Sequence, residues 1–153
     1  MLVPFVPTPD EVAIEMLKCA NVRKEDIVLD LGAGNARPLI IAKKQFNVRL
    51  AIGVELDKRL CKEAYEDKSV EIICGDMLTL APILIPKVNV LLSYLSTRTN
   101  ELLEPYIINY GKKGLRVISH DFRYDHLTLY DVKRVKAMGL LGETEHTIYC
   151  YKL

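Results

Sequence analysis

The stretch VLDLGAGNAR, residues 28–37, decides how this chain folds. An apolar run typical of a buried strand ends on an acid, Asp30, and Gly-Ala-Gly follows close behind it. Glycine at Gly32 and Gly34 permits a tight turn and lets the backbone pass close to a ligand. In doubly wound α/β sheets, ligands bind outside the carboxyl ends of the strands. The stretch therefore predicts a parallel strand that ends at a ligand site.

Strand and helix patterns alternate along the chain on both sides of this stretch. Such alternation implies βαβ units with right-handed crossovers, and continuous apolar strands suit a sheet that is covered on both faces. We therefore expect an α/β fold with a doubly wound, Rossmann-like, mostly parallel sheet. The expected strands are 26–31, 49–55, 70–74, 89–93 and 115–119, and the expected helices are 9–20, 36–46, 58–67 and 97–110.

Three segments do not follow this alternation. Residues 1–8 contain prolines that forbid a regular helix, so we expect them to be extended. Residues 131–139 and 145–153 alternate polar and apolar side chains, which predicts an antiparallel strand pair that closes one sheet edge. Between the third and fourth strands stand Pro82 and Pro86, and there we expect a helix to be missing.

Length and composition limit the class of protein. The chain has 153 residues, of which 50% are hydrophobic and 27% charged, so we expect one globular domain over residues 1–153. A formal net charge of +1 gives no sign of a nucleic-acid or membrane partner. No apolar run is long enough to span a bilayer, and the N-terminus lacks the features of a signal peptide. We expect a cytoplasmic monomer.

The four cysteines are widely spaced and form no C-x-x-C pair. Structural zinc sites use clustered ligands, so we expect no metal site. We expect these cysteines to be reduced and to pack as small hydrophobic side chains.

Three acids stand at or just past the predicted ends of three consecutive strands, at Asp30, Glu55 and Asp76. An acid after the second strand can hold ribose hydroxyls, and its charge strengthens both hydrogen bonds. A dinucleotide is a poor fit, because G-x-G-x-x-G requires a small residue where Arg37 stands and Asp30 would repel the diphosphate. S-adenosylmethionine instead carries an ammonium and a sulfonium group. We expect Asp30 to face its methionine part, Glu55 its ribose and Asp76 its adenine amino group.

The structural alternative is that these acids bind nothing. Glu55 could be an exposed acid near a sheet edge, and Asp76 could cap the segment that follows it.

Several stretches resemble a known family. DLGAGNAR, GVELD and CGDM resemble motif I, the acid after it and motif II of class I, seven-strand methyltransferases. VPTPDEVAIEML, VLLSYLSTRTNELLEPYI, GLRVISHDF and HTIYCY together resemble the small archaeal protein lysine methyltransferases, whose relatives methylate the ATP synthase c-subunit in mitochondria. The resemblance covers residues 6–151. It implies methyl transfer from S-adenosylmethionine to lysine amino groups of proteins, often with loose substrate choice.

The resemblance also implies cofactor contacts. Residues 1–20 would form a covering segment and helix. Asn35 and Ala36 stand where the family usually has an acid and a glycine, and Pro38 stands in the first helical turn. The implied cofactor-binding residues are Pro7, Thr8, Asp30, Gly32, Ala33, Gly34, Asn35, Glu55, Leu56, Asp76, Met77 and Ser93.

Lysine methylation requires a neutral amine, whereas a free lysine has a pKa of about 10.4. Groups that orient the lone pair suit this reaction better than a strong base, because alignment alone can supply much of the rate. We expect Ser93 and Tyr94, after the fourth strand, to form the wall of the lysine channel. His120 and Asp121, after the fifth strand, are the expected polar groups opposite. We expect the remaining histidines, His126 and His146, to be structural.

Other functions stay open. Methyltransferases of adenine and glutamine amino groups carry Asn/Asp-Pro-Pro-Tyr after the fourth strand, whereas this chain has Ser-Tyr-Leu-Ser at 93–96. An RNA or small-molecule methyltransferase on the same fold is the first alternative, although no basic stripe with interleaved aromatic residues supports RNA. A degenerate module that binds the cofactor or a partner without turnover is the second.

Overall fold

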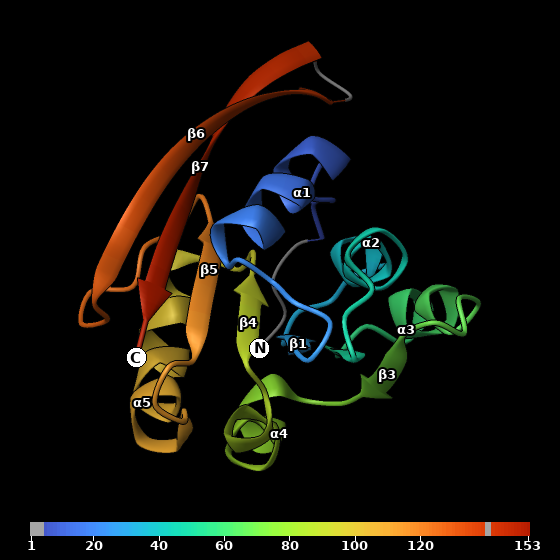
Figure 1. Ribbon diagram of the computed structural model, residues 1–153. Helices are drawn as coiled ribbons and strands as arrows, with labels where there is room; N and C mark the ends of the chain where they lie inside the picture. Colours follow the sequence, from blue (N-terminus) through green and yellow to red (C-terminus); the bar gives the residue numbers. More distant parts are fainter. Residues whose placement is uncertain (1–4, 140–141) are drawn as a thin grey trace.

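The computed structural model describes residues 5–139 and 142–153, and within them seven strands form one sheet in the order β3-β2-β1-β4-β5-β7-β6 (Figure 1). The first five strands pair in parallel, as the sequence predicts. They are β1 (Ile27–Asp30), β2 (Leu50–Glu55), β3 (Glu71–Cys74), β4 (Val90–Ser93) and β5 (Arg116–His120).

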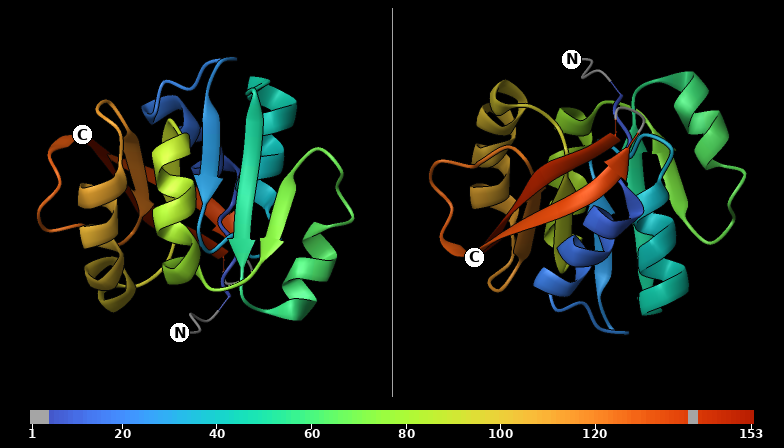
Figure 2. Two further views of the ribbon diagram at one scale, coloured as in Figure 1. Left: turned by 90° about the horizontal axis from the view of Figure 1, so that it is seen from below. Right: turned by 90° about the horizontal axis from the view of Figure 1, so that it is seen from above.

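Helices cover both faces of this sheet, and α1 and α2 lie on the opposite side from α4 and α5 (Figure 2). One buried cluster lies under α1 (Asp10–Cys19), α2 (Arg37–Phe46) and α3 (Lys58–Ala64). A second cluster lies under α4 (Met77–Leu84) and α5 (Thr97–Tyr110). Because both faces are covered, Val28 and Leu29 of β1 are fully buried although they point to opposite faces.

The strand order reverses between β1 and β4. The chain runs from β1 outward to β3, returns to place β4 on the other side of β1, and then continues to β5. The crevice outside the carboxyl ends of β1 and β4 is the topological switch point where such sheets bind ligands.

The prediction that no helix follows the third strand is wrong. Helix α4 forms around Pro82, and a 3₁₀ turn, Ile85–Lys87, holds Pro86. Asp76 begins α4, because its side chain accepts a hydrogen bond from the backbone N–H of Leu78. Ala81 and Ile85 are fully buried in the second cluster, and this burial outweighs the hydrogen bond that a proline cannot donate.

The predicted antiparallel pair is present and long. β6 (Leu129–Gly139) and β7 (Gly142–Lys152) form a hairpin that reaches across α1 (Figure 1). β7 pairs antiparallel with β5, so the hairpin closes that side of the parallel sheet. None of the helices in residues 5–139 and 142–153 is long and apolar enough to span a bilayer.

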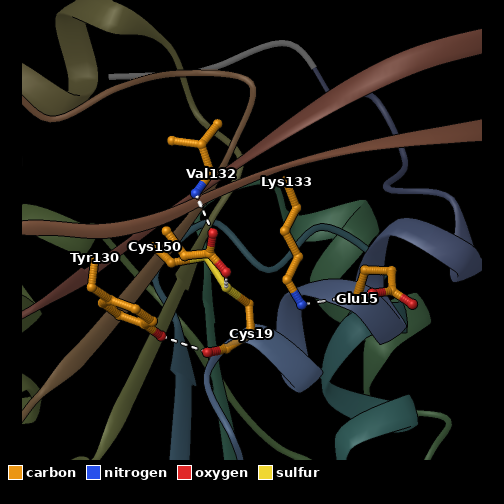
Figure 3. Close-up of a disulfide and its surroundings, with 7 residues drawn as sticks. Glu15, Cys19, Tyr130, Val132, Lys133 and Cys150 are labelled. Carbon is orange, nitrogen blue, oxygen red and sulfur yellow. Dashed lines mark hydrogen bonds and ion pairs between the residues drawn. A yellow bond between two sulfur atoms is a disulfide. The ribbon is translucent and has the colours of Figure 1, made fainter.

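The prediction of reduced cysteines is also wrong. Cys19 forms a disulfide with Cys150, and Cys61 forms one with Cys74. The first joins the end of α1 to β7 beneath the hairpin (Figure 3). The partners are 131 residues apart in the sequence, and only the fold brings them together.

Candidate active site

A cavity of about 570 Å³ lies at the switch point, outside the carboxyl ends of the parallel strands. Its volume is in the range of small-molecule and cofactor sites. Many of the residues predicted to bind a cofactor line it, and Tyr94 lies at the same cavity. The predicted residues on its wall are Thr8, Asp30, Gly32, Ala33, Asn35, Glu55, Leu56 and Met77.

Asp30 is a buried carboxylate at the wall of this cavity, with 6% of its surface exposed. Its Oδ1 accepts a hydrogen bond of 3.1 Å from the backbone N–H of Gly32. Burial raises the pKa of Asp30 to about 7, against the effect of that hydrogen bond, and the nearby Glu55 raises it further. A cation in the cavity would stabilise the ionised carboxylate, so the site favours a positively charged ligand group.

Glu55 ends β2 and holds two loops in place. Its Oε1 accepts from the backbone N–H of Gly34 at 2.7 Å, and its Oε2 accepts from that of Asp57 at 2.8 Å. Each carboxylate oxygen can accept a second hydrogen bond. Glu55 lines the cavity and lies on an interior strand, so the alternative of an exposed edge acid does not describe it.

The glycine loop is closely packed from both sides. A side chain on Gly32 would meet Leu95 Cδ2 at 2.6 Å, and one on Gly34 would collide with the ring of Phe5. Gly34 also has a positive φ of 58°, which glycine adopts without cost. Ala36 has a φ of 65° where the resemblance leads one to expect glycine. The loop therefore adopts a left-handed backbone at Ala36 without a glycine there.

The N-terminal segment lies against this loop. Phe5, Val6 and Thr8 line the cavity, whereas Pro7 is not on its wall. The described residues 5–8 lie in no helix or strand, which agrees with the prediction that no regular helix forms there, and residues 1–4, with Pro4, lie outside the described range. Helix α1 is tied to α2 by a two-point ion pair, in which Arg37 Nε and Nη2 contact the carboxylate of Asp10 at 3.0 and 2.9 Å.

Three of the predicted cofactor residues besides Pro7 do not line the cavity. Gly34 is covered by Phe5. Asp76 lies between two lining residues and uses one oxygen as the cap of α4. Ser93 is 1% exposed, and its hydroxyl contacts the Tyr124 hydroxyl at 3.1 Å in the second buried cluster. The side chain of Ser93 is therefore engaged in the interior, which leaves its backbone as the part nearest the site.

Tyr94, His120 and Asp121 lie together, but His120 does not face Tyr94 across an open channel as predicted, because it is fully buried and neither His120 nor Asp121 is on the cavity wall. The rings of Tyr94 and His120 stack with centroids 3.7 Å apart. His120 Nδ1 lies 3.1 Å from the hydroxyl of Thr8, so the N-terminal segment reaches the end of β5. Asp121 has a left-handed backbone with a φ of 65°, and its Oδ2 lies 3.5 Å from His120 Nε2.

These side chains offer no strong base. Burial lowers the pKa of His120 to about 4, although the charge of Asp121 acts in the opposite direction. Burial also raises the pKa of Tyr94 above its usual value. Near neutral pH, both groups are uncharged; the Tyr94 side chain lies at the cavity, whereas both ring nitrogens of the buried His120 already contact Thr8 and His146.

The other two histidines differ from each other. His126 Nδ1 lies 2.8 Å from the nearly buried carboxylate of Glu104, which agrees with a structural role. His146 Nδ1 lies 2.7 Å from His120 Nε2, so it adjoins the site instead.

Sequence reasoning missed several lining residues. Phe5 and Leu95 cover the glycine loop from opposite sides. Asp57, Arg59 and Leu60 line the cavity at the start of α3. Their position just after the acid of β2 could have identified them, because the carboxyl end of a parallel strand lies at the ligand crevice.

Comparison with known proteins finds no matching family model, but it finds a curated relative. The chain is 36% identical over 156 residues to a protein-lysine N-methyltransferase of Saccharolobus islandicus. The match covers 97% of this chain and 92% of the relative.

Several solved structures with the same fold are methyltransferases. An RNA methyltransferase from Salinibacter ruber, in complex with S-adenosyl-L-homocysteine, has a TM-score of 0.82 and 28% identity, with 96% of this chain and 93% of that chain covered. Precorrin-6y C5,15-methyltransferase from Geobacter metallireducens has a TM-score of 0.74 and 13% identity, with 99% and 93% covered. At that identity the second likeness concerns the fold alone.

Proposed function

We propose that the cavity at the switch point holds S-adenosylmethionine and that Tyr94 marks the lysine channel. The premise is that this chain belongs to the family of S-adenosylmethionine-dependent protein-lysine N-methyltransferases. The protein is a methyltransferase that acts on the amino groups of lysine side chains in proteins. The alignment with the Saccharolobus islandicus protein-lysine N-methyltransferase covers 97% of this chain, and so spans the glycine loop and the ends of β4 and β5.

The buried Asp30 is the observation that carries the cofactor assignment. S-adenosylmethionine supplies a methyl group on a sulfonium centre and carries an ammonium group beside it. Asp30 faces these cationic groups, because its carboxylate is buried, lines the cavity and gains a partner when a cation is bound.

The remaining contacts follow from the wall of the cavity. Glu55 accepts hydrogen bonds from the ribose hydroxyls on the lone pairs that its two loop contacts leave available. Leu56 is 40% exposed at the cavity, and with Met77 it offers apolar surface to the adenine ring. Asp76 receives the adenine amino group with the part of its carboxylate not used in capping α4. Thr8 and Phe5 cover the cofactor from the N-terminal segment.

The lysine enters beside Tyr94. The ring of Tyr94, which stacks on the fully buried His120, removes water from the amine, which lowers a lysine pKa and favours its neutral form. The polar groups of Tyr94, Asp121 and the Ser93 backbone orient the lone pair toward the cavity. Neither His120 nor Tyr94 needs to take the proton as a strong base, since water can accept it before the transfer.

An RNA substrate is the second candidate, favoured by the likeness to the Salinibacter ruber enzyme. Against it stand the net charge of +1 and the lack of a basic stripe with interleaved aromatic residues in the sequence. Ser-Tyr-Leu-Ser after β4, in place of Asn/Asp-Pro-Pro-Tyr, speaks only against adenine amino groups as the target. We therefore propose protein partners that present exposed lysines, no nucleic-acid substrate, and a monomeric enzyme that works in the cytoplasm.

Labelled S-adenosylmethionine, a cell extract and the purified protein test this function. Mass spectrometry of the labelled bands should find methyl groups on protein lysines, and the label should be lost with protease but not with nuclease. An Asp30→Ala variant that remains folded should give no label. Label lost to nuclease would move the substrate to RNA. Cofactor binding without label, across extracts from several sources, would favour a degenerate binding module.

A further inference from the structure

Three side chains next to the site bring one potential ligand atom each close together. Nε2 of His120 lies 2.7 Å from Nδ1 of His146, and Oδ2 of Asp121 lies 3.5 Å and 3.8 Å from these two nitrogens. The three atoms lie within 4.8 Å of one another. Donors that bind a tetrahedral Zn²⁺ at about 2.1 Å are about 3.4 Å apart. The cluster already has this size, with one pair too close by less than 1 Å.

The opposite atom of each side chain is fixed by the fold. His120 Nδ1 lies 3.1 Å from the Thr8 hydroxyl, and His146 Nε2 lies 2.8 Å from the Thr144 hydroxyl. Asp121 Oδ1 accepts from the backbone N–H of Thr147 at 2.9 Å. Metal-binding histidines in proteins show this arrangement, in which the outer ring nitrogen donates to a nearby acceptor and fixes the tautomer. Each imidazole can carry its one proton on the outer nitrogen and present a lone pair inward.

Burial and donor type indicate which cation fits. The side chains of His120, His146 and Asp121 are 0%, 13% and 32% exposed, so the cluster opens to solvent on the Asp121 side. Two imidazoles and one carboxylate suit borderline cations such as Zn²⁺, whereas Mg²⁺ and Ca²⁺ prefer all-oxygen sites. Three protein ligands leave one position open, as in zinc sites that also bind water.

We propose that His120, Asp121 and His146 form a binding site for a divalent transition-metal ion of the Zn²⁺ class, at the junction of β5 and β7. In the metal-free protein a proton lies between the two imidazoles, and in the metal-bound protein the ion takes its place while His146 moves its proton to Nε2. The sequence hid this site, because the first two ligands are adjacent and the third lies 26 positions from His120 on the neighbouring strand.

Isothermal titration with Zn²⁺ tests the proposal, using a chain without a histidine tag and without reductant, so that the cysteines stay in disulfides. We expect one ion per chain. His146→Gln and Asp121→Asn should each weaken binding at least about tenfold, and Thr144→Val should weaken it by about 10–100-fold. Asparagine tolerates the left-handed backbone at position 121, so Asp121→Asn should fold.

His126→Gln is the matched control, since His126 is exposed and pairs with Glu104 away from the cluster. It should bind Zn²⁺ as the wild type does. Co²⁺ titration adds a spectroscopic readout, in which visible bands of a tetrahedral site should appear without a thiolate charge-transfer band. No saturable Zn²⁺ binding, or binding that survives both His146→Gln and Asp121→Asn, would overturn the proposal.

Discussion

The buried charge of Asp30 is expected to lower the stability of the protein and to bind the cofactor. Substitutions of this one residue can test both effects. Burial raises its pKa from an ordinary value of 3.8 to about 7. The folded state therefore holds this proton to a higher pH than the unfolded state. The stability associated with that proton is complete below about pH 4 and is lost as the pH rises through about 7. Without a bound cation, the protein is expected to be least stable at pH values where the Asp30 carboxylate is charged.

Asp30→Asn removes this dependence, because the amide has a similar shape and no charge. We expect the variant's melting temperature to exceed that of the wild type at about pH 8, by an amount that shrinks toward about pH 5, while S-adenosylmethionine binding is lost. Thermal melts at several pH values and calorimetric titration with the cofactor check both effects. Asp125→Asn, at an exposed acid, is the control and should leave both unchanged. Normal cofactor binding in Asp30→Asn would refute the assignment.

A substitution at Tyr94 tests the proposed lysine channel. Phenylalanine keeps the ring that stacks on His120 and removes only the hydroxyl. If the hydroxyl orients the lysine amine, Tyr94→Phe should lower kcat by about tenfold to a hundredfold, with little change in cofactor affinity. Steady-state kinetics and cofactor titration separate the two quantities. Tyr110→Phe, on the exposed side of α5, is the control. Unchanged turnover would remove the Tyr94 hydroxyl from the site.

At the scale of elements, we expect the N-terminal segment to cover the cavity from outside the sheet. A substitution in this segment tests that expectation. The ring of Phe5 lies against Gly34 and lines the cavity while it is 44% exposed. Phe5→Ala should weaken cofactor binding by about threefold to tenfold, because one apolar wall is lost. Cofactor titration measures this, with Tyr65→Ala as a control on an exposed aromatic residue away from the cavity. Equal affinity in both variants would show that the segment does not cover the cofactor.

Most elements could be predicted from the sequence because their signals are local. The sequence patterns place the apolar strands and the acids or glycines after them correctly to within a few residues, and right-handed crossovers predict the doubly wound sheet, whereas the strand order comes from the structure. Helix α4 could not be predicted, because its prolines argue against a helix and only packing against the second cluster compensates. Local sequence signals do not show how much burial the folded structure gives a segment.

In the site, too, features with a local sequence signal could be predicted, and features that depend on packing could not. The ends of β1 and β2 place Asp30 and Glu55 at the cavity, since parallel strands share one carboxyl edge, whereas His120 at the end of β5 is fully buried and off the cavity wall. The direction of a side chain is not local information, and the hydroxyl of Ser93 contacts Tyr124 in the interior. The contact of His146 with His120 depends on strand register between β5 and β7, which the sequence alone does not fix.

At the scale of the whole molecule, the two disulfides close very different lengths of chain. Cys19–Cys150 spans 131 residues and joins α1 to the hairpin, whereas Cys61–Cys74 spans 13 residues beside β3. A disulfide restricts the unfolded chain more when it closes a longer loop, with model values of about 3 kcal/mol for a 15-residue loop and about 4.7 kcal/mol for a 100-residue loop.

Removing the long-range disulfide should therefore cost more stability than removing the short one. We expect Cys19→Ser with Cys150→Ser to lower the free energy of unfolding by about 1–2 kcal/mol more than Cys61→Ser with Cys74→Ser. Urea titration of the two double variants and of the wild type, all without reductant, measures the difference. Adding reductant to the wild type should reproduce the combined loss. Equal destabilisation by the two pairs would mean that lost local contacts, and not the restriction of the unfolded chain, set the contribution of these disulfides.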